Sequence, residues 1–247
     1  MRTAIQLGIN GFGVLGRLPE DDLSAALDLV EAGGFDAVEV MGNVAGHPEG
    51  VATLRRRTEV AALHLFVADV VEPAELDRWV GVLDGLGCSR LILSAFGMEQ
   101  SVAGYRALSG QLAAVLQRLE DAGTRLYFHC HDVELTPLPR DGAARRGVDV
   151  LREAVPDLRV VVDTYWALAA GADPAATVTE FREFSGYYHF KDGTPEGGRE
   201  FGRGAVDFPV CLQAAERSAV DWVVLEQDNG TDDPLGLFTR FHAVVKR

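Results

Sequence analysis

Cysteine is scarce in this chain of 247 residues, which contains only Cys88, Cys130 and Cys211. Because the number is odd and the spacing is wide, the sequence offers neither a disulfide framework nor zinc-finger spacing. Cysteine use of this kind predicts a protein of the reducing cytoplasm. The apolar stretch at the N-terminus is also too short and too rich in glycine for a signal peptide.

Positive charge is the second shortage, because 23 Lys and Arg residues face 37 Asp and Glu residues, a formal net charge of −14. Binding of nucleic acid needs clustered cations, so a nucleic-acid partner is disfavoured. The basic run Arg55–Arg57 is interpreted as the solvated end of a helix. Long apolar runs are also missing, and strand-sized runs such as Val160–Val162 predict no membrane span.

Short apolar runs alternate with helical segments along the whole chain, and the helices have recognisable beginnings such as Asp173-Pro174. Near-continuous apolar strands between helices are typical of a buried parallel sheet. Eight such units in about 250 residues favour a closed (β/α)₈ TIM barrel over an open doubly wound sheet. No linker divides the sequence, so we expect one domain over residues 1–247. The predicted strands are Ala4–Ile9, Ala37–Met41, Val60–Phe66, Arg90–Ala95, Arg125–His131, Arg159–Asp163, Tyr187–Lys191 and Trp222–Glu226.

The run Gly11-Phe12-Gly13-Val14-Leu15-Gly16 matches the dinucleotide-binding pattern G-x-G-x-x-G. A true pattern of this kind places a helix N-terminus at the pyrophosphate. Here Pro19 and the acidic residues after it predict a later helix start, and those acids would repel a phosphate. We therefore interpret this run as a loop after the first barrel strand.

Polar side chains end four consecutive predicted strands. Strand five ends with His129 and His131 on one face, strand six with Asp163, strand seven contains His189, and strand eight ends at Glu226. Active sites of TIM barrels lie at these strand ends. Imidazole and carboxylate together suit a divalent transition metal rather than calcium. The sequence therefore predicts one divalent ion held by these residues, with Mn²⁺ as the leading candidate and Co²⁺, Fe²⁺, Zn²⁺ or Mg²⁺ as alternatives.

Several stretches resemble the sugar phosphate isomerase/epimerase family, the xylose isomerase-like TIM barrels. The resemblance covers most of the chain and is strongest after position 125. The stretches that carry it are Gly34–Glu39 (G-F-D-x-V-E), His129–Glu134 (H-N-H-D-x-E), Asp163–Trp166 (D-x-Y-W) with Gly171–Pro174 (G-x-D-P), His189–Gly193 (H-x-K-D-G), Gly202–Asp207 (G-x-G-x-V-D) and Trp222–Asp228 (W-x-x-x-E-x-D).

The resemblance implies that Asp163, His189 and Glu226 are metal ligands. Many members carry a glutamate on the fifth strand, whereas this sequence has His129 there, as one branch of the family does. Because two opposed glutamates form the acid/base pair of the keto-sugar epimerases, the departure argues against a two-base epimerisation. His131 is a candidate for the missing group, because histidine is the residue type whose ordinary pKa lies nearest neutrality.

The remaining candidates line the same strand ends. Glu226 or His131 would move the proton, and Lys191 would stabilise oxyanion charge or neutralise local carboxylates. The expected substrate contacts are Trp166 and Phe96 as stacking surfaces, Glu39 as a partner of a substrate hydroxyl or of a metal ligand, and Arg203 as a phosphate-binding candidate.

These observations predict a metal-dependent isomerase or epimerase that acts on a keto- or aldo-sugar or a related polyol through an enediolate. A lyase or dehydratase acting on a keto-sugar or 3-keto-glycoside begins with the same proton abstraction and stays open. A non-catalytic barrel that serves as a partner subunit is the third interpretation. A homo-oligomer is compatible with the sequence.

Overall fold

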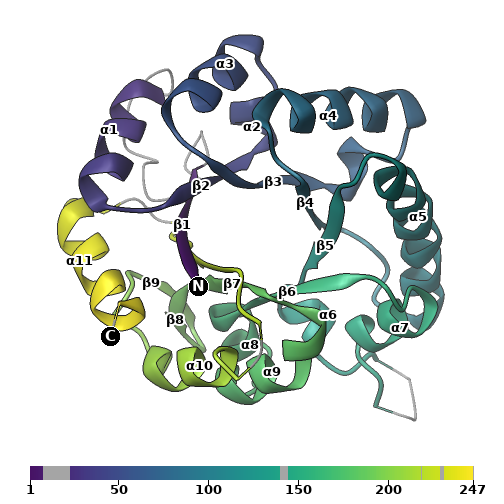
Figure 1. Ribbon diagram of the computed structural model, residues 1–247. Coiled ribbons are helices and arrows are strands. Elements are labelled where there is room, and N and C mark those ends of the chain that lie inside the picture. The colour runs from purple at the N-terminus through teal and green to yellow at the C-terminus, as the bar shows by residue number, and fades with distance from the viewer. Residues whose placement is uncertain (8–22, 140–143, 218, 229–230, 247) are drawn as a thin grey trace.

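Eight parallel strands close into a barrel in the order β1-β10-β7-β6-β5-β4-β3-β2 (Figure 1). The computed structural model describes residues 1–7, 23–139, 144–217, 219–228 and 231–246. The predicted (β/α)₈ fold is therefore confirmed. The barrel strands are β1 (Arg2–Leu7), β2 (Ala37–Met41), β3 (Val60–Phe66), β4 (Arg90–Ser94), β5 (Arg125–His129), β6 (Arg159–Asp163), β7 (Tyr187–Phe190) and β10 (Trp222–Leu225).

Helices surround the barrel on its outer face (Figure 1). Proline occupies the first turn of α4 and α9, and the Asp173 carboxylate caps α9 by accepting a hydrogen bond of 2.7 Å from the backbone N–H of Ala176. The bounds are α1 (Leu23–Gly33), α2 (Gly42–Ala45), α3 (Pro48–Arg57), η1 (Val67–Asp69), α4 (Pro73–Leu86), α5 (Val102–Asp121), α6 (Asp132–Leu135), α7 (Gly147–Ala154), α8 (Thr164–Ala169), α9 (Pro174–Phe181), η2 (Arg182–Phe184), α10 (Phe208–Ala215) and α11 (Pro234–Val245).

The predicted strand bounds agree closely with the structure, and three of the eight coincide with it at both ends. β5 ends at His129, so His131 lies just beyond the strand and precedes the single turn α6. The glycine run 11–16, the helix start at Pro19 and the end of the first predicted strand at Ile9 lie outside the described residues.

A two-stranded antiparallel ribbon, β8 (Asp192–Thr194) with β9 (Gly197–Arg199), follows strand β7 and was not predicted. The Asp192 carboxylate, 2% exposed, shapes the loop after it, because its oxygens accept backbone N–H groups of Gly193, Gly202 and Gly204, each at 2.8 Å. The ribbon and this loop extend the barrel wall beside Lys191.

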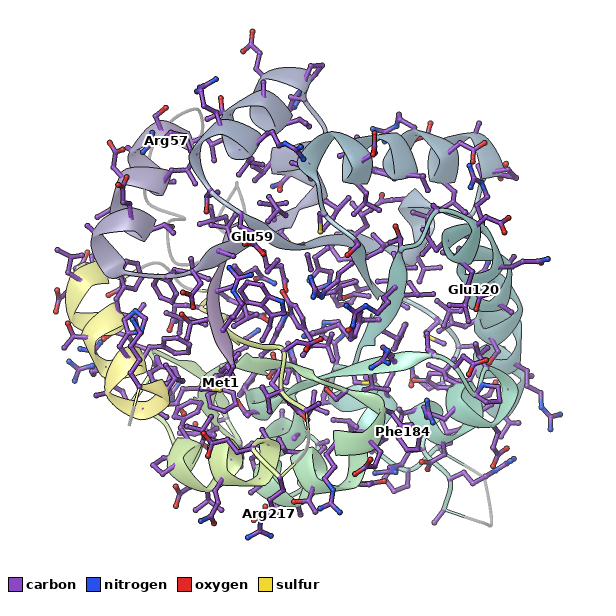
Figure 2. The ribbon with its side chains drawn as sticks, viewed as in Figure 1. Met1, Arg57, Glu59, Glu120, Phe184 and Arg217 are labelled. Atoms are coloured by element: carbon purple, nitrogen blue, oxygen red, sulfur yellow. The ribbon has the colours of Figure 1, made fainter. Side chains whose placement is uncertain are left out.

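Side chains fill the space inside the ring of strands (Figure 2). Ten buried residues, mostly small or aromatic, form an apolar cluster there, separate from the larger core between the strands and the helices. This cluster contains Ala4, Ala37, Ala61, Ala62, Ile92, Tyr127, Val161, Tyr187, Trp222 and Val224. No helix among the described residues is long and apolar enough to cross a bilayer.

Candidate metal centre

A layer of polar side chains lies above the apolar cluster at the carboxyl ends of the barrel strands. Because side chains on a strand alternate between faces, the residue two positions after an inward apolar residue also points inward. On all eight strands that residue is polar and buried. The members of this polar layer are Gln6, Glu39, His64, Ser94, His129, Asp163, His189 and Glu226.

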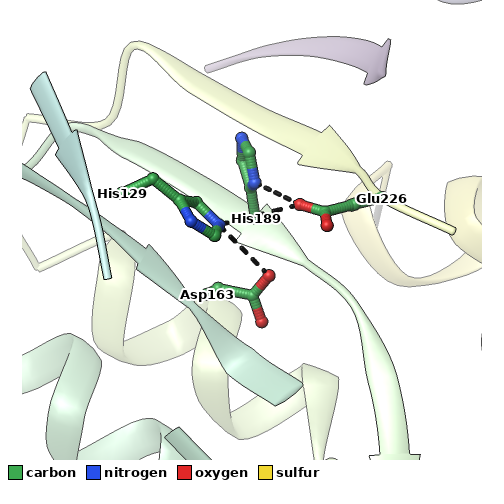
Figure 3. Close-up of side chains that lie close together, drawn as sticks. All are labelled: His129, Asp163, His189 and Glu226. Carbon is green, nitrogen blue, oxygen red and sulfur yellow. Dashed lines mark hydrogen bonds and ion pairs between the residues drawn. The ribbon is translucent and has the colours of Figure 1, made fainter. Parts of the chain in front are cut away.

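Four members of the layer come together as a candidate ligand set. His129, Asp163, His189 and Glu226 each offer one ligand atom, and these atoms all lie within 4.8 Å of one another (Figure 3). The Nε2 atom of His129 is 3.5 Å from Asp163 Oδ2 and 3.8 Å from Glu226 Oε2. His189 Nδ1 contacts Glu226 Oε2 directly. The structure thus brings together all four predicted ligands, and His129 rather than His131 joins the set.

Glu39, which lies outside this ligand set, orients the His189 ring through a hydrogen bond. Its Oε2 atom lies 2.8 Å from His189 Nε2, so Nε2 carries the proton when the imidazole is neutral and Nδ1 is left as the ligand atom. Glu39 also accepts hydrogen bonds of 2.8 Å from Gln6 and from the hydroxyl of Tyr187. Of the two roles that the sequence suggested for Glu39, the geometry matches orientation of a ligand.

His64 completes the network around Glu39. Its Nδ1 atom lies 2.9 Å from Glu39 Oε1, and its Nε2 atom lies 2.6 Å from the hydroxyl of Ser94. Burial alone would raise the pKa of Glu39, but the hydrogen bonds and charges of His189 and His64 outweigh it and hold that pKa well below its usual range. Glu39 is therefore an anion at the base of the site.

Several buried polar atoms of His129 and Asp163 have no hydrogen-bond partner among the described residues. Neither ring nitrogen of His129 has a hydrogen-bond partner among the described residues, and neither does Asp163 Oδ2. The other Asp163 oxygen accepts the backbone N–H of Trp166 at 2.9 Å. Buried polar atoms are almost always satisfied, so orphaned donors and acceptors that face one another fit a missing ion. The donor set of two imidazoles and two carboxylates suits a divalent transition metal or Mg²⁺.

The charges of the site lead to the same conclusion. Three buried carboxylates, those of Glu39, Asp163 and Glu226, face only one buried ammonium, that of Lys191, among the charged groups of the site. Burial, followed by the nearby Glu226 charge, raises the pKa of Asp163 to about 8. Burial lowers the pKa of His189, but Glu39 and Glu226 raise it more, to about 10. Two protons thus compensate the carboxylates of the metal-free protein, a charge equal to that of one divalent cation.

Lys191 lies at the edge of the ligand set and points to its carboxylates. The ammonium donates a hydrogen bond of 2.8 Å to Glu226 Oε1 and pairs with Asp228 at the rim at 2.5 Å. Burial would lower the pKa of Lys191, but Glu226 and Asp163 outweigh it and raise that pKa, so the ammonium stays charged. Its Nζ atom also lies 4.8 Å from the centre of the Trp166 ring.

His131 occupies the wall of the site beside three aromatic rings. The imidazole centre is 4.6 Å from that of Phe96, 5.1 Å from that of Trp166 and 4.8 Å from that of His129. Phe96 is 67% exposed although it lies next to this buried histidine. The structure therefore places the expected stacking residues Phe96 and Trp166 beside His131, and the Lys191 ammonium also lies close to the Trp166 ring.

Arg203 is the one proposed site residue that the structure does not bring to the ligand set. Its guanidinium pairs with Glu200 at 3.1 Å, and its side chain is 66% exposed. The geometry gives no support to the predicted phosphate contact. Sequence reasoning also left three members of the polar layer without a role, namely Gln6, His64 and Ser94. The alternation along strands one, three and four was the available signal, since each lies two residues after an inward apolar residue.

No protein-family model matches the chain, and no curated protein matches it. Solved structures do match. The probable 3-DHS dehydratase AsbF, involved in petrobactin synthesis, from Bacillus anthracis matches with a TM-score of 0.75 at 13% identity over 100% of both chains. A sugar phosphate isomerase/epimerase from Parabacteroides distasonis matches with a TM-score of 0.75 at 13% identity over 98% of this chain and 92% of that chain.

A third match is a xylose isomerase-like TIM barrel protein from Mycobacterium smegmatis in complex with magnesium. Its TM-score is 0.70 at 11% identity, over 99% of this chain and 95% of that chain. The chain has the xylose isomerase-like TIM-barrel fold. The fold that the sequence motifs implied is thereby confirmed. Two of these matched proteins are named for different reactions, a dehydration and an isomerisation or epimerisation, so the fold accommodates both.

Proposed function

We propose that the protein is a divalent-metal-dependent isomerase or epimerase that acts on a keto- or aldo-sugar or a related polyol. The observation that carries this proposal is the buried set His129, Asp163, His189 and Glu226 with His131 directly beside it. A ligand set next to a side chain that can move a proton is the requirement for proton transfer beside a carbonyl. The net charge of −14 also favours a small neutral substrate over nucleic acid.

A divalent cation at this set, for which we propose Mn²⁺, supplies Lewis-acid stabilisation of negative charge on substrate oxygens. The chain's own residues do the rest. Lys191 has three N–H groups and uses two of them on Glu226 and Asp228, so one remains for a substrate oxygen. The Trp166 ring, which lies near both His131 and Lys191, offers a flat surface for the apolar face of a sugar.

His131 is the better of the two proposed proton carriers. Burial would raise the pKa of Glu226, but Lys191 and His189 outweigh it and hold that pKa well below its usual range, which makes the carboxylate a weak base. Among the described residues, no charged side chain forms a hydrogen bond with the His131 ring, and Glu134 Oε2 lies 3.7 Å from its Nδ1 atom. One base on one face can take a proton from the carbon beside the carbonyl and return it to the neighbouring carbon. We therefore favour a one-base isomerisation over a two-base epimerisation.

A dehydratase or other lyase is the second candidate, favoured because His131 and Lys191 both lie close to the Trp166 ring. His131 would take the proton beside the carbonyl and pass it to the leaving hydroxyl as the carbon–oxygen bond breaks, while the Lys191 ammonium donates a hydrogen bond to that oxygen. The product is an unsaturated carbonyl compound and water. The match to a structure named as a probable 3-DHS dehydratase supports this candidate at the level of the fold.

Solvent-deuterium exchange on a panel of ketoses, aldoses and keto-glycosides tests the proposal. The manganese-loaded protein is expected to place deuterium beside the carbonyl of at least one compound, and a new enone absorbance would identify elimination instead. His131→Gln should keep one equivalent of metal and lose exchange. Asp163→Ala should lose both. A metal-loaded wild type that exchanges no compound would refute the enzyme and favour the non-catalytic partner subunit.

A further inference from the structure

Glu134 is a fully buried carboxylate that the proposed reaction has not used. It lies in α6, the single turn that follows His131, and is 0% exposed. A buried carboxylate without partners costs several kcal/mol of stability, so its position must be maintained by specific contacts. Those contacts all lead to His131 or to the helix behind it.

Both oxygens of Glu134 are committed. Oε2 accepts the backbone N–H of His131 at 2.8 Å and lies 3.7 Å from Nδ1 of the same residue. Oε1 lies 3.3 Å from the hydroxyl of Tyr105, a fully buried residue of α5. The single hydrogen of the Tyr105 hydroxyl lies within reach of both Glu134 Oε1 and Gln100 Oε1, the second at 2.8 Å. Glu134 is thus fixed between the barrel end and helix α5.

The two ring nitrogens of His131 have different surroundings. Nδ1 is buried, and no described residue lies within hydrogen-bond distance of it, while Glu134 Oε2 is 3.7 Å away. A carboxylate can only accept a hydrogen bond, so it favours the tautomer with the proton on Nδ1. That tautomer leaves the lone pair on Nε2. Catalytic hydrogen bonds are often long before the substrate binds, so 3.7 Å is compatible with such a pair.

We propose that Glu134 is a positioning residue that fixes the orientation and the tautomer of His131. This inference rests on the proposed role of His131 in proton transfer. Glu134 holds the peptide of His131 through the backbone N–H and directs the Nδ1 proton toward itself, so Nε2 faces the substrate as the base. Tyr105 contacts Glu134 in turn, which connects the wall of the site to α5.

The test replaces Glu134 by Gln, which retains an oxygen for the backbone N–H of His131 but removes the charge. Nitrogen-15 NMR reads the His131 tautomer in the metal-free and in the magnesium-loaded protein, both at one fixed pH. The wild type is expected to carry the proton on Nδ1, and Glu134→Gln should lower the Nδ1-protonated fraction, because a neutral amide oxygen is a weaker acceptor than a carboxylate. His131→Gln assigns the signals, and Glu153→Gln, an exposed acid on α7, is the matched control that should change nothing.

Kinetics provides the second measurement on the same variants. For a substrate found by exchange, kcat should fall about 10- to 100-fold in Glu134→Gln, with an unchanged metal content and a nearly unchanged KM. Tyr105→Phe should give a smaller fall with the same pattern, and it keeps the inference testable if Glu134→Gln does not fold. A His131 tautomer that is the same in wild type and Glu134→Gln would overturn the inference.

The outcomes also separate this inference from the proposed function. A tautomer shift in a protein that exchanges no sugar would support the positioning of His131 and refute the enzyme. Full exchange activity in Glu134→Gln would support the enzyme and refute the positioning role. Loss of metal together with activity in Glu134→Gln would also refute it, because the carboxylate would then support the ligand set instead.

Discussion

Removal of the metal should make the stability of this protein fall as the pH rises through neutrality. In the metal-free protein the pKa of Asp163 is raised to about 8, by burial and then by Glu226. The pKa of His189 is raised to about 10, because Glu39 and Glu226 outweigh its burial. In the unfolded chain both groups titrate near their ordinary values, about 3.9 for Asp and 6.5 for His. Between pH 7 and 8 the folded state therefore binds more protons than the unfolded state.

The sign and the size follow from linkage. When a group is protonated mainly in the folded state, the free energy of unfolding falls by about 1 kcal/mol for each unit by which the pH rises. For His189 the stabilisation is complete below its unfolded pKa and disappears as the pH rises toward 10. For Asp163 the cost grows as the pH rises from about 4 to about 8. Together they predict a loss of about 2 kcal/mol between pH 7 and pH 8.

Urea denaturation in the presence of a chelator, at pH 7.0 and 8.0, measures this loss. Asp163→Asn removes one of the two groups but can still accept the Trp166 N–H through its amide oxygen. We expect this variant to lose only about 1 kcal/mol over the same range and to exceed the metal-free wild type in stability at pH 8. Saturation with Mn²⁺ should remove the loss in the wild type, because the ion replaces both protons.

Asp36→Asn is the matched control. Burial would raise the pKa of Asp36, but hydrogen bonds from Thr3 outweigh it, so the carboxyl titrates below the range tested. This variant should lower the stability equally at both pH values. A metal-free wild type whose stability is constant or rises between pH 7 and 8 would refute the reasoning. So would an Asp163→Asn variant with the slope of the wild type.

Three further outcomes are expected. Glu39→Gln should weaken metal binding about 10- to 100-fold in a calorimetric titration, because a neutral amide replaces the carboxylate that accepts the His189 Nε2 proton, and an unchanged affinity would contradict this. Arg203→Ala should leave metal content and exchange kinetics unchanged, since its guanidinium lies outside the site, and a raised KM would restore it as a substrate contact. Gly147→Ala should cost about 1–3 kcal/mol in urea denaturation, because a Cβ there would lie 2.1 Å from the Tyr105 ring, and a neutral effect would show that the ring yields.

The sequence predicted the barrel and the candidate ligands for one physical reason. In parallel strands the inward residues recur every second position, and the carboxyl ends meet at one edge, so His129, Asp163, His189 and Glu226 had to converge once eight strands closed. The choice between His129 and His131 could not be made from this alternation, because both share one face. The structure separates them because β5 ends at His129 and the chain turns into α6.

Other features depend on contacts that no local pattern contains. Arg203 was a reasonable phosphate ligand by charge, but it pairs with Glu200, which also contacts Arg240 of helix α11. In the sequence, Glu134 stood out only as the last residue of the motif His129–Glu134. Its role depends on Tyr105, 29 positions earlier in the chain. Such long-range pairs are set by how the helices pack, which strand periodicity does not determine.

The polar layer offers a second group that is close enough to hold a metal, namely Glu39, His64 and His189. Its atoms, however, already have partners at ordinary hydrogen-bond distances, Glu39 with His64 and His189 at 2.9 and 2.8 Å and His64 with Ser94 at 2.6 Å. An ion there would only replace hydrogen bonds that are already formed. At the first group, an ion gives a partner to the atoms of His129 and Asp163 that have none among the described residues.

We therefore expect one metal ion per chain, measured by elemental analysis after manganese loading and desalting. His64→Gln should keep that single equivalent, while His129→Ala should lose it. Two equivalents in the wild type, one of them lost in His64→Gln, would refute this reasoning. Residues whose hydrogen bonds are already satisfied would then bind a metal as well. One equivalent in both the wild type and His64→Gln would mean that the buried layer has two parts. Glu39, His64 and Ser94 satisfy one another by hydrogen bonds, whereas His129 and Asp163 need an ion as their partner.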